Sequence, residues 1–577
     1  MSGLILACVR DAAHPSNSAE TLARCATRLS PPNITPHDPT LIEARGLVAV
    51  VVNPMTSVRF ADGGVCLGAL YDDREDWSVT GAPSPDGSYA LCRYDRNIVE
   101  VLTDPVASRT LWYVQTDEVF LVSTSQRALV SLLASFEPNP RALAWMLSAG
   151  SLGPESSWDR RLTCIPGDCR ITLDRKRWSV QIDARPVVFS PERGSEHEHV
   201  EHLLEAIRET FSHVDLADSG WLLPLSGGGD SRAALLFLLE QGHKPTCITW
   251  GDEASERRPG TDLAVAKALA TALDTEHILL RLDKTSAGAV DTLDRFLVAG
   301  EGRIDHLGGY TDGLEIWRRL FEMGAPGVVR GDQAFGLWRV YSEADARRSE
   351  GAIAVTDYAP GHPVRRLALA AQLWPSQLKK RSEESLAQYR DRLYLEFRLP
   401  MVLAALTQIK TAYVELACPL QSRRIVYAVR RMPDAMRTDK AAARELVRAL
   451  GPDIPFASEE APDPTDRYLS QPAAVEEMAR ELTDPSARSL FEEGDLQLLL
   501  DRLLRSGSPT PQSVLSRARK THGRKLRRLL PQAVVRAAKE AVGPPELSPQ
   551  RLAFRAYLAL RMSRILTEDA GSLRKLH

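Results

Sequence analysis

A glycine-rich segment at residues 226–231 carries the strongest chemical signal in the sequence. It reads Ser-Gly-Gly-Gly-Asp-Ser and lies between an apolar run, 221–225, and a helical pattern, 232–239. Glycines let the backbone approach phosphate oxygens, and a helix start offers unpaired N–H groups and a positive dipole end. The segment therefore predicts an anion site at a strand-to-helix turn. The residues expected to contact a bound nucleotide are Ser226, Gly227, Gly228, Gly229, Asp230 and Ser231.

Asp230 is the odd member of this loop, because a carboxylate repels a phosphate unless a cation lies between them. We therefore interpret Asp230 as a Mg²⁺ ligand rather than a phosphate contact. The alternative is that the turn only links a strand to a helix. The complete hexapeptide in this context favours the functional interpretation.

A second strand is expected at residues 246–251, after the helix that follows the loop. Ligands collect at the carboxyl ends of parallel strands, so we expect this strand to lie beside the first one. Its last residues, Thr249, Trp250 and Gly251, are the candidates for adenine recognition. Asp262 opens the next helical pattern, and we interpret it as a solvated helix cap.

The hexapeptide resembles the pyrophosphate loop, SGGxDS, of ATP pyrophosphatases of the asparagine synthetase type. The resemblance implies ATP and Mg²⁺ as cofactors, cleavage between the α and β phosphates, and an acyl-adenylate that an amine attacks. Segment 327–336 repeats the strand, glycine turn and acid, and it resembles the second magnesium motif of the same family. It implies that Asp332 is the second metal ligand and that Gly331 lies next to the nucleotide. An aspartate that only ends a strand in a tight turn is the alternative.

The first 185 residues consist of short apolar runs, such as 46–52 and 119–123, broken by turn residues. This spacing predicts strand-rich sheets, and helical patterns take over from residue 199. Segments 86–91, 103–113 and 121–129 resemble, in family order, the N-terminal glutaminase domain of asparagine synthetases. The implied fold is an α+β Ntn-hydrolase-like sandwich (residues 1–190) followed by an α/β ATP-pyrophosphatase (PP-loop) domain (residues 195–577), with a parallel sheet and a helical C-terminal part.

The glutaminase-like half departs from its family at the nucleophile. A working glutaminase of this type exposes a cysteine at position 2, where this chain has Ser2. The glutamine-orienting segment of the family is replaced by 67–72. We therefore predict a degenerate glutaminase and an amine that is carried by the substrate.

The synthetase half also departs from its family, at the base that deprotonates the attacking amine. The usual position holds Val329 and Arg330, and Glu396 is a candidate substitute, with a surface carboxylate on a helix as the alternative. A free α-amine has a pKa of about 7.7 to 8.0 and demands less of a base. The family's lysine that steadies pyrophosphate is missing as well, and Arg330, Lys440 and Arg467 are candidates for its charge.

Composition favours an ordinary globular protein of two or more domains. The chain has 577 residues, 44% hydrophobic and 25% charged, with a formal net charge of -3. This charge gives no reason to expect nucleic acid or a membrane as a partner. No apolar run reaches about 18 residues and the amino end lacks the basic start of a signal peptide, so we expect a cytoplasmic protein. Eight dispersed cysteines fit reduced thiols and not a zinc site.

The whole pattern, with RGDxxFG at 330–336, resembles lasso-peptide cyclases. These enzymes adenylate an Asp or Glu side chain of a linear precursor peptide and close it with the N-terminal amine to a macrolactam. The resemblance implies a linear core peptide as substrate, with a precursor-processing protease and a leader-binding protein as partners. The alternatives are a β-lactam synthetase-like or other asparagine synthetase-like amide synthetase, and an inactive nucleotide-binding scaffold for peptide maturation. The basic stretch 502–539 fits a dock for an acidic peptide or a solvated helix face.

Overall fold

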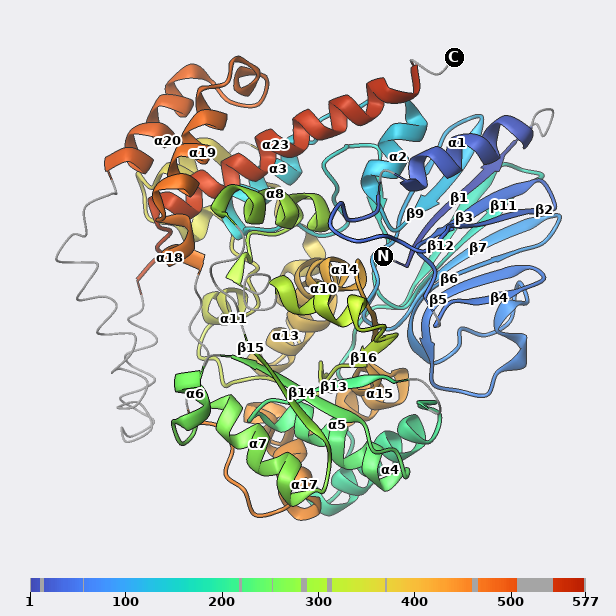
Figure 1. Cartoon of the computed structure of the whole chain (residues 1–577), viewed down its shortest axis with the longest axis vertical. Helices are drawn as coiled ribbons and strands as arrows, with labels where there is room; N and C mark the ends of the chain where they lie inside the picture. The colour runs from blue at the N-terminus through green and yellow to red at the C-terminus, as the bar shows by residue number, and fades with distance from the viewer. Residues whose placement is uncertain are drawn as a thin grey trace.

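Two antiparallel sheets form the first part of the chain in the computed structural model (Figure 1). The structure describes residues 2–10, 15–27, 29–55, 57–216, 220–251, 253–281, 288–308, 314–368, 371–458, 465–505 and 543–574. Within them the strand orders are β10-β8-β9-β1-β3-β2 and β12-β11-β7-β6-β5-β4. The strands are β1 (Gly3–Val9), β2 (Thr40–Ala44), β3 (Leu47–Val52), β4 (Arg59–Ala61), β5 (Gly64–Leu70), β6 (Gly87–Tyr94), β7 (Ile98–Thr103), β8 (Trp112–Gln115), β9 (Val119–Ser123), β10 (Thr163–Cys164), β11 (Cys169–Asp174) and β12 (Ser179–Ala184). The strands expected at 46–52 and 119–123 are confirmed as β3 and β9.

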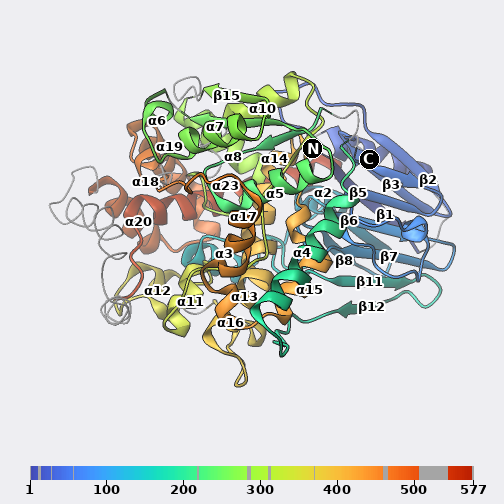
Figure 2. The same cartoon turned by 90° about the horizontal axis from the view of Figure 1, so that it is seen from below.

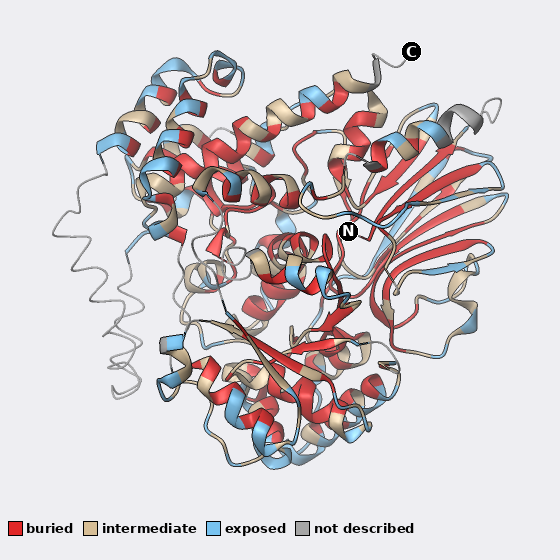
Figure 3. Ribbon diagram, in the orientation of Figure 1, coloured by how far each residue is buried: buried red, intermediate tan, exposed pale blue. Residues whose placement is uncertain are grey.

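Strand β1 shows how side-chain alternation builds two cores. Leu4, Leu6 and Cys8 point into the core between the two sheets. Ile5 and Ala7 point the opposite way, into a core that also contains helical residues. Both faces of β1 are buried, which explains why its sequence is a continuous apolar run (Figure 3).

A parallel sheet forms the second part of the structure, in the order β15-β14-β13-β16-β17. Its strands are β13 (Leu222–Pro224), β14 (Thr246–Gly251), β15 (His277–Arg281), β16 (Gly327–Val329) and β17 (Glu415–Ala417). Strand β14 lies parallel to β13, as predicted. The chain proceeds from β13 to β14 and β15 on one side, and then continues with β16 and β17 on the other. The order therefore reverses between β13 and β16, and such switch points are where ligands bind in open α/β sheets.

Helices surround both parts (Figures 1 and 2). In the first part they are α1 (Pro15–Thr27), α2 (Gln126–Leu133) and α3 (Pro140–Ala149). Those near the parallel sheet include α4 (Glu196–Ser212), α5 (Gly229–Glu240), α6 (Glu253–Arg257), α7 (Asp262–Ala272), α10 (Leu314–Glu322), α14 (Ala404–Thr411), α15 (Arg423–Arg431), α16 (Asp434–Arg437) and α17 (Ala441–Leu450). The remainder are α8 (Ala289–Gly300), α11 (Glu343–Ser349), α12 (Pro363–Ala368), α13 (Leu386–Leu393), α18 (Thr465–Leu469), α19 (Pro472–Thr483), α20 (Glu493–Arg505) and α23 (Pro549–Arg574).

The last helix, α23, ties the end of the chain back to the first part. It packs against α2 and α3, and an ion pair joins Arg127 to Asp569 at 2.7 Å. A second ion pair, buried, joins Arg555 to Asp305 at 2.7 Å. One hydrophobic core therefore includes residues from both ends of the chain. The domain boundary expected at 190–195 stays a prediction.

Two further expectations concern the helical C-terminal part. Most of the basic stretch 502–539 falls outside the described residues, so its interpretation stays a prediction. None of the helices that the structure describes combines the length and apolarity needed to cross a membrane.

Candidate active site at the ends of two parallel strands

The loop at 226–231 connects β13 to α5, and no side chain caps the start of this helix. Its N-cap is Gly228, which has no side-chain hydrogen bond to offer. The first N–H groups of a helix have no partner within the helix, so an uncapped start is suited to an anion. The loop closes on itself through Ser231 Oγ, which accepts from the Ser226 N–H and lies 3.0 Å from Ser226 Oγ. Direct contacts of these hydroxyls with a nucleotide stay a prediction.

Asp262 does not cap its own helix, contrary to the expectation from the sequence. Thr261 is the N-cap of α7, and its hydroxyl accepts from the Ala264 N–H at 3.2 Å. Asp262 Oδ1 instead accepts from the Gly227 N–H at 2.9 Å. A carboxylate from the neighbouring helix therefore fixes the glycine loop. Sequence reasoning missed this role because the two residues are far apart along the chain.

Gly331 brings the two predicted acids together. A Cβ at this position would lie 2.6 Å from Ser231 N and 2.8 Å from the Asp230 carbonyl carbon. Real Cβ atoms do not approach backbone so closely, so only glycine allows the turn after β16 to rest on the loop after β13. Asp230 and Asp332 consequently lie on either side of the switch point of the sheet.

Each of the two carboxylates has a cation beside it. Lys440 Nζ lies 2.6 Å from Asp230 Oδ2. The Arg330 guanidinium lies 3.3 to 3.4 Å from the Asp332 carboxylate. Burial raises the pKa of Asp332, but the charges of Arg330 and Lys410 outweigh burial, so the net effect is a lowered pKa. Both carboxylates are only partly buried, with 33% of Asp230 and 28% of Asp332 exposed.

The backbone at Lys440 is held in an uncommon conformation. Asp439 has φ 59° and Lys440 has φ 57°, both in the left-handed region that non-glycine residues rarely adopt. The Asp439 N–H donates to Leu337 O at 2.8 Å, and Asp439 Oδ1 accepts from the Arg339 N–H at 3.2 Å. The turn after β16 thus positions the segment that carries Lys440. No sequence motif predicted this role of the turn.

The end of β14 offers backbone rather than free side chains. Thr249 Oγ1 donates to Leu225 O at 2.6 Å and lies 2.9 Å from His277 Nε2. Trp250 packs edge-on against Trp317, with ring centroids 5.6 Å apart. A Cβ at Gly251 would lie 2.6 Å from Leu263 Cδ1, so that position is closed by packing. Adenine recognition at Thr249, Trp250 and Gly251 stays a prediction, and it would rest on main-chain groups.

The contacts of Glu396 are with residues outside the two acid loops. It lies in the π-helical segment Tyr394–Leu403. Its carboxylate accepts from the Val187 N–H at 3.0 Å and from Arg392 at 3.0 Å, and Arg381 lies 3.7 Å away. The structure therefore gives no support to Glu396 as the base for an attacking amine. Its contacts fit a structural role, which joins this helix to the segment after β12.

Two buried groups next to Asp332 were not expected from the sequence. Tyr394 Oη donates to Gln333 O at 2.9 Å. Cys418 Sγ lies 3.9 Å from Asp332 Oδ2, and burial raises the pKa of this thiol, which keeps it protonated. A signal for Cys418 did exist, because it follows β17, whose carboxyl end meets the same sheet edge as that of β16.

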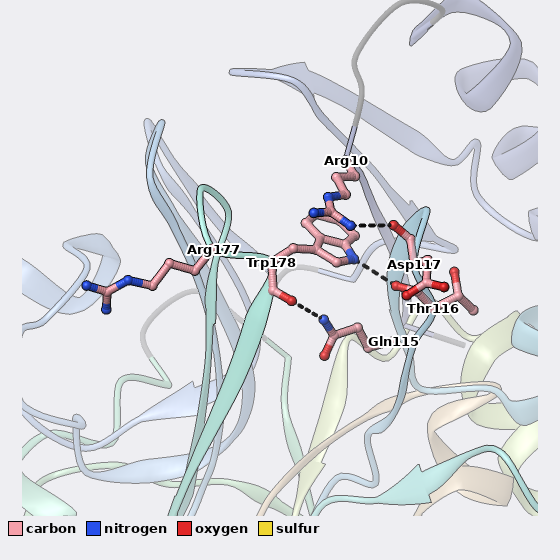
Figure 4. Close-up of a pocket in the computed structure, with 6 residues that line it drawn as sticks. All are labelled: Arg10, Gln115, Thr116, Asp117, Arg177 and Trp178. Carbon is pink, nitrogen blue, oxygen red and sulfur yellow. Dashed lines mark hydrogen bonds between the residues drawn. The ribbon is translucent and has the colours of Figure 1, made fainter.

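The amino end presents a contrasting picture at Ser2. Only 4% of Ser2 is exposed, and its hydroxyl lies 3.5 Å from Asn53 O. A pocket of about 410 Å³ lies elsewhere on this half, at the turns near Arg10 and Trp178 (Figure 4). There Trp178 Nε1 donates to Thr116 O and Gln115 Nε2 donates to Trp178 O, each at 2.7 Å. These bonds satisfy the polar groups between neighbouring turns, and the pocket adds nothing to the site after β13.

Comparisons with known proteins leave the family open. No protein-family model matches the chain, and no curated protein matches it. Among solved structures, one match is glutamine phosphoribosylpyrophosphate amidotransferase from B. subtilis complexed with ADP and GMP, at 7% identity and a TM-score of 0.20. The alignment covers 48% of this chain and 65% of the amidotransferase chain. Another is an allosteric regulatory enzyme of purine biosynthesis, at 9% identity and a TM-score of 0.20, covering 50% and 66%.

These structural matches are weak. The chain spans less than two thirds of the length of either neighbour. A TM-score of 0.20 is too low to decide the fold or the activity of this chain. The geometry of the site must therefore carry the functional argument.

Proposed function

We propose that this chain is an ATP-dependent amide ligase of the asparagine synthetase type that closes a linear peptide to a macrolactam, as lasso-peptide cyclases do. One observation carries the proposal. The uncapped helix start after β13 and the acid turn after β16 meet through Gly331 at the switch point of a parallel sheet. A phosphate-binding turn with two aspartates at its edge is the arrangement that nucleotide chemistry requires.

The two aspartates fit a magnesium ion. Mg²⁺ in nucleotide sites takes one or two protein carboxylates and completes its shell with phosphate oxygens and water. Asp230 and Asp332 supply such a donor set, and both are partly exposed. When bound, the ion would neutralise charge on the phosphates. Within the described residues no cluster of three or more His, Cys, Asp or Glu side chains suggests a different metal site.

The proposed reaction has two balanced steps. A side-chain carboxylate oxygen of the peptide attacks the α-phosphorus of ATP, the bond to the β-phosphate oxygen breaks, and pyrophosphate leaves. The N-terminal amine of the peptide then attacks the acyl carbon, AMP leaves, and one proton is released as the amide forms. The protein contributes mainly by positioning the reactants and neutralising charge. Lys440 and Arg330 are the cations best placed to do so, because they lie beside Asp230 and Asp332.

The degenerate amino half supports a substrate-borne amine. The hydroxyl of Ser2 is buried, and its contact is the backbone carbonyl of Asn53, directly after β3. Ammonia cut from glutamine is therefore not the expected nucleophile. A precursor-processing protease and a leader-binding protein remain proposed partners.

A direct assay tests the proposal. The protein is mixed with ATP, Mg²⁺ and candidate linear peptides, and AMP, pyrophosphate and peptide mass are followed. We expect AMP and pyrophosphate in equal amounts and a peptide that has lost one water. ADP as the sole nucleotide product would refute the proposal.

A second candidate function rests on the two ion pairs. Because Lys440 and Arg330 already neutralise Asp230 and Asp332, the chain is also suited to an inactive scaffold that holds nucleotide or peptide for other enzymes. A scaffold would bind ATP without releasing pyrophosphate. The same assay therefore separates the two functions.

A further inference from the structure

A row of cations runs along helix α17 and starts at the Asp230 loop. Lys440 directly precedes the helix, and Arg444 and Arg448, four residues apart within it, lie on one helix face. Lys440 pairs with Asp230. In the described part of the chain, Arg444 and Arg448 are in contact with aromatic rings rather than with carboxylates. No acid among the described residues forms an ion pair with either of these two arginines.

Aromatic rings line this row. Arg444 Cζ lies 5.7 Å from the centroid of Trp338 and 5.4 Å from that of Phe456. Arg448 Cζ lies 5.6 Å from the Phe456 centroid. Such distances allow cation–π attraction, which keeps the guanidinium groups in place without removing their charge. We call these four residues, Trp338, Arg444, Arg448 and Phe456, the α17 shelf.

The shelf is continuous with the phosphate loop. A Cβ at Gly229 would lie 3.5 Å from Phe456 Cε1, and the Ala457 N–H donates to Gly227 O at 2.9 Å. Beneath the ring lies Arg232, of which only 2% is exposed and whose Cζ is 4.4 Å from the Phe456 centroid. Arg232 Nη1 donates to Ile454 O at 2.6 Å and so fixes the segment that carries Phe456. Arg232 Nε has no partner among the described residues.

Trp338 is exposed although its backbone is firmly held. Trp338 as a whole is 60% exposed, which is the largest exposed fraction among the large apolar residues that the structure describes. Its carbonyl accepts from Arg390 Nη1 at 2.8 Å, and the neighbouring Leu337 O accepts from the Asp439 N–H. An indole held at the surface beside Arg444, with Arg448 one turn further along α17, is suited to a ligand with both apolar and anionic groups.

We propose that the α17 shelf binds the part of the peptide substrate next to the acid that becomes adenylated. This inference rests on the proposed function and names the substrate class of the same site: a peptide with acidic and aromatic side chains. Arg444 and Arg448 attract the acidic groups, and Trp338 packs against the apolar ones. Because the row ends at Lys440, a peptide lying on the shelf brings its carboxylate to the Asp230 loop. The rival occupants, the terminal phosphates of the nucleotide, need no exposed indole.

A binding experiment on the full chain tests the shelf without relying on turnover. The probe is a fluorescein-labelled peptide of repeated Gly-Glu-Phe-Ser units, and its anisotropy is followed as protein is added. We expect Arg444→Gln, Arg448→Gln and Trp338→Ala each to weaken binding by about three- to tenfold. A twin peptide with Gln for Glu should bind more weakly to the unchanged protein. Added salt should weaken binding of the acidic probe.

Two control variants have matched chemistry away from the shelf. Arg430→Gln removes an arginine that stacks on Tyr427 at 5.0 Å, and Leu373→Ala removes an apolar side chain from a residue that is 55% exposed. Neither should change binding of the probe. Circular dichroism on all five variants checks that each remains folded.

Several results would overturn the inference. The first is that the unchanged protein does not bind the probe. The second is that the shelf variants bind the probe as tightly as the unchanged protein, and the third is that the control variants lose as much binding as the shelf variants. A shelf variant that raises KM for ATP or weakens inhibition by inorganic pyrophosphate, while leaving probe binding unchanged, would assign the shelf to phosphates. Probe binding without AMP release would refute the proposed reaction and leave the shelf standing. AMP release by the unchanged protein, together with normal probe binding by the shelf variants, would refute the shelf and leave the proposed reaction standing.

Discussion

The amino end and the loop after β13 differ in how far their polar side chains are exposed to solvent. At the amino end the Ser2 hydroxyl is buried and lies near the backbone carbonyl of Asn53. After β13 and β16, two carboxylates remain partly exposed, each beside a cation. The first arrangement serves packing, whereas the second keeps charge where a ligand can reach it. The contrast supports the proposal that the chemistry takes place at the parallel sheet.

The largest expected effect comes from removing one carboxylate charge. Asp230→Asn and Asp332→Asn should each lower peptide-dependent AMP release by about a hundredfold or more, because each removes a proposed metal ligand. Thermal unfolding should change little, since both side chains are partly exposed. Asp274→Asn is the control, because this exposed residue forms an ion pair with Lys244 at the surface. Near-normal turnover in either site variant would place the magnesium site elsewhere.

Next in size is the effect of separating the two loops. Gly331→Ala places a methyl group against Ser231 N and the Asp230 carbonyl carbon, so we expect a loss of about 1 to 3 kcal/mol in the free energy of unfolding. AMP release should fall with it, even at temperatures where the variant is fully folded. Gly571→Ala is the control, because a Cβ there meets nothing within 4 Å. If Gly331→Ala keeps full activity, contact between the loops is not required.

A smaller effect, on the free energy of unfolding, concerns Glu350, a buried carboxyl that directly follows α11. Burial raises its pKa to about 7, although Ser349 and Arg398 oppose the rise. A raised pKa in the folded state makes stability greatest at low pH, and stability is then lost as pH rises from about 4.3 towards 7. Glu350→Gln should remove this part of the pH dependence and stabilise the protein at pH 8 by up to about 3 kcal/mol.

Denaturant unfolding at a series of pH values checks this prediction. The variant should keep the pH dependence of stability that arises from the other titratable groups. Parallel stability curves for variant and unchanged protein would show that Glu350 does not titrate in this range.

The smallest expected effect is at the amino end. Ser2→Ala should leave AMP release and ring closure unchanged, and glutamine should be neither hydrolysed nor required. The reason is that the Ser2 hydroxyl is buried and has no positioned base among its contacts in the described structure. Glutamate release that disappears in Ser2→Ala would restore an active amidohydrolase and erase the contrast between the two regions.

Local patterns predicted the elements of the site well. The strand expected at 246–251 is β14, and the glycine segment does connect a strand to a helix. These features depend on residues that are neighbours in sequence, such as an apolar run followed by glycines. The order of the outer strands does not follow from such local patterns, because residues 330–414 separate β16 from β17.

What escaped prediction depends on contacts between distant segments. Asp262 was expected to cap a helix, but it accepts a hydrogen bond from Gly227. Lys440 was a candidate for the family's missing charge, but its pairing with Asp230, next to two successive residues with left-handed backbone angles, was not expected. Glu396 was a candidate base, but Arg392, Arg381 and the Val187 N–H surround it. No local periodicity encodes such tertiary partners.

The central claim is that this chain cleaves ATP at the α-phosphate by forming an acyl-adenylate on a peptide carboxylate. The most direct test uses a candidate linear peptide whose side-chain carboxylate carries oxygen-18, incubated with the protein, ATP and Mg²⁺. We predict that AMP acquires one labelled oxygen for each ring closed, and that Asp230→Asn yields none. Label in inorganic phosphate with ADP as the product, or unlabelled AMP beside a closed ring, would contradict this account.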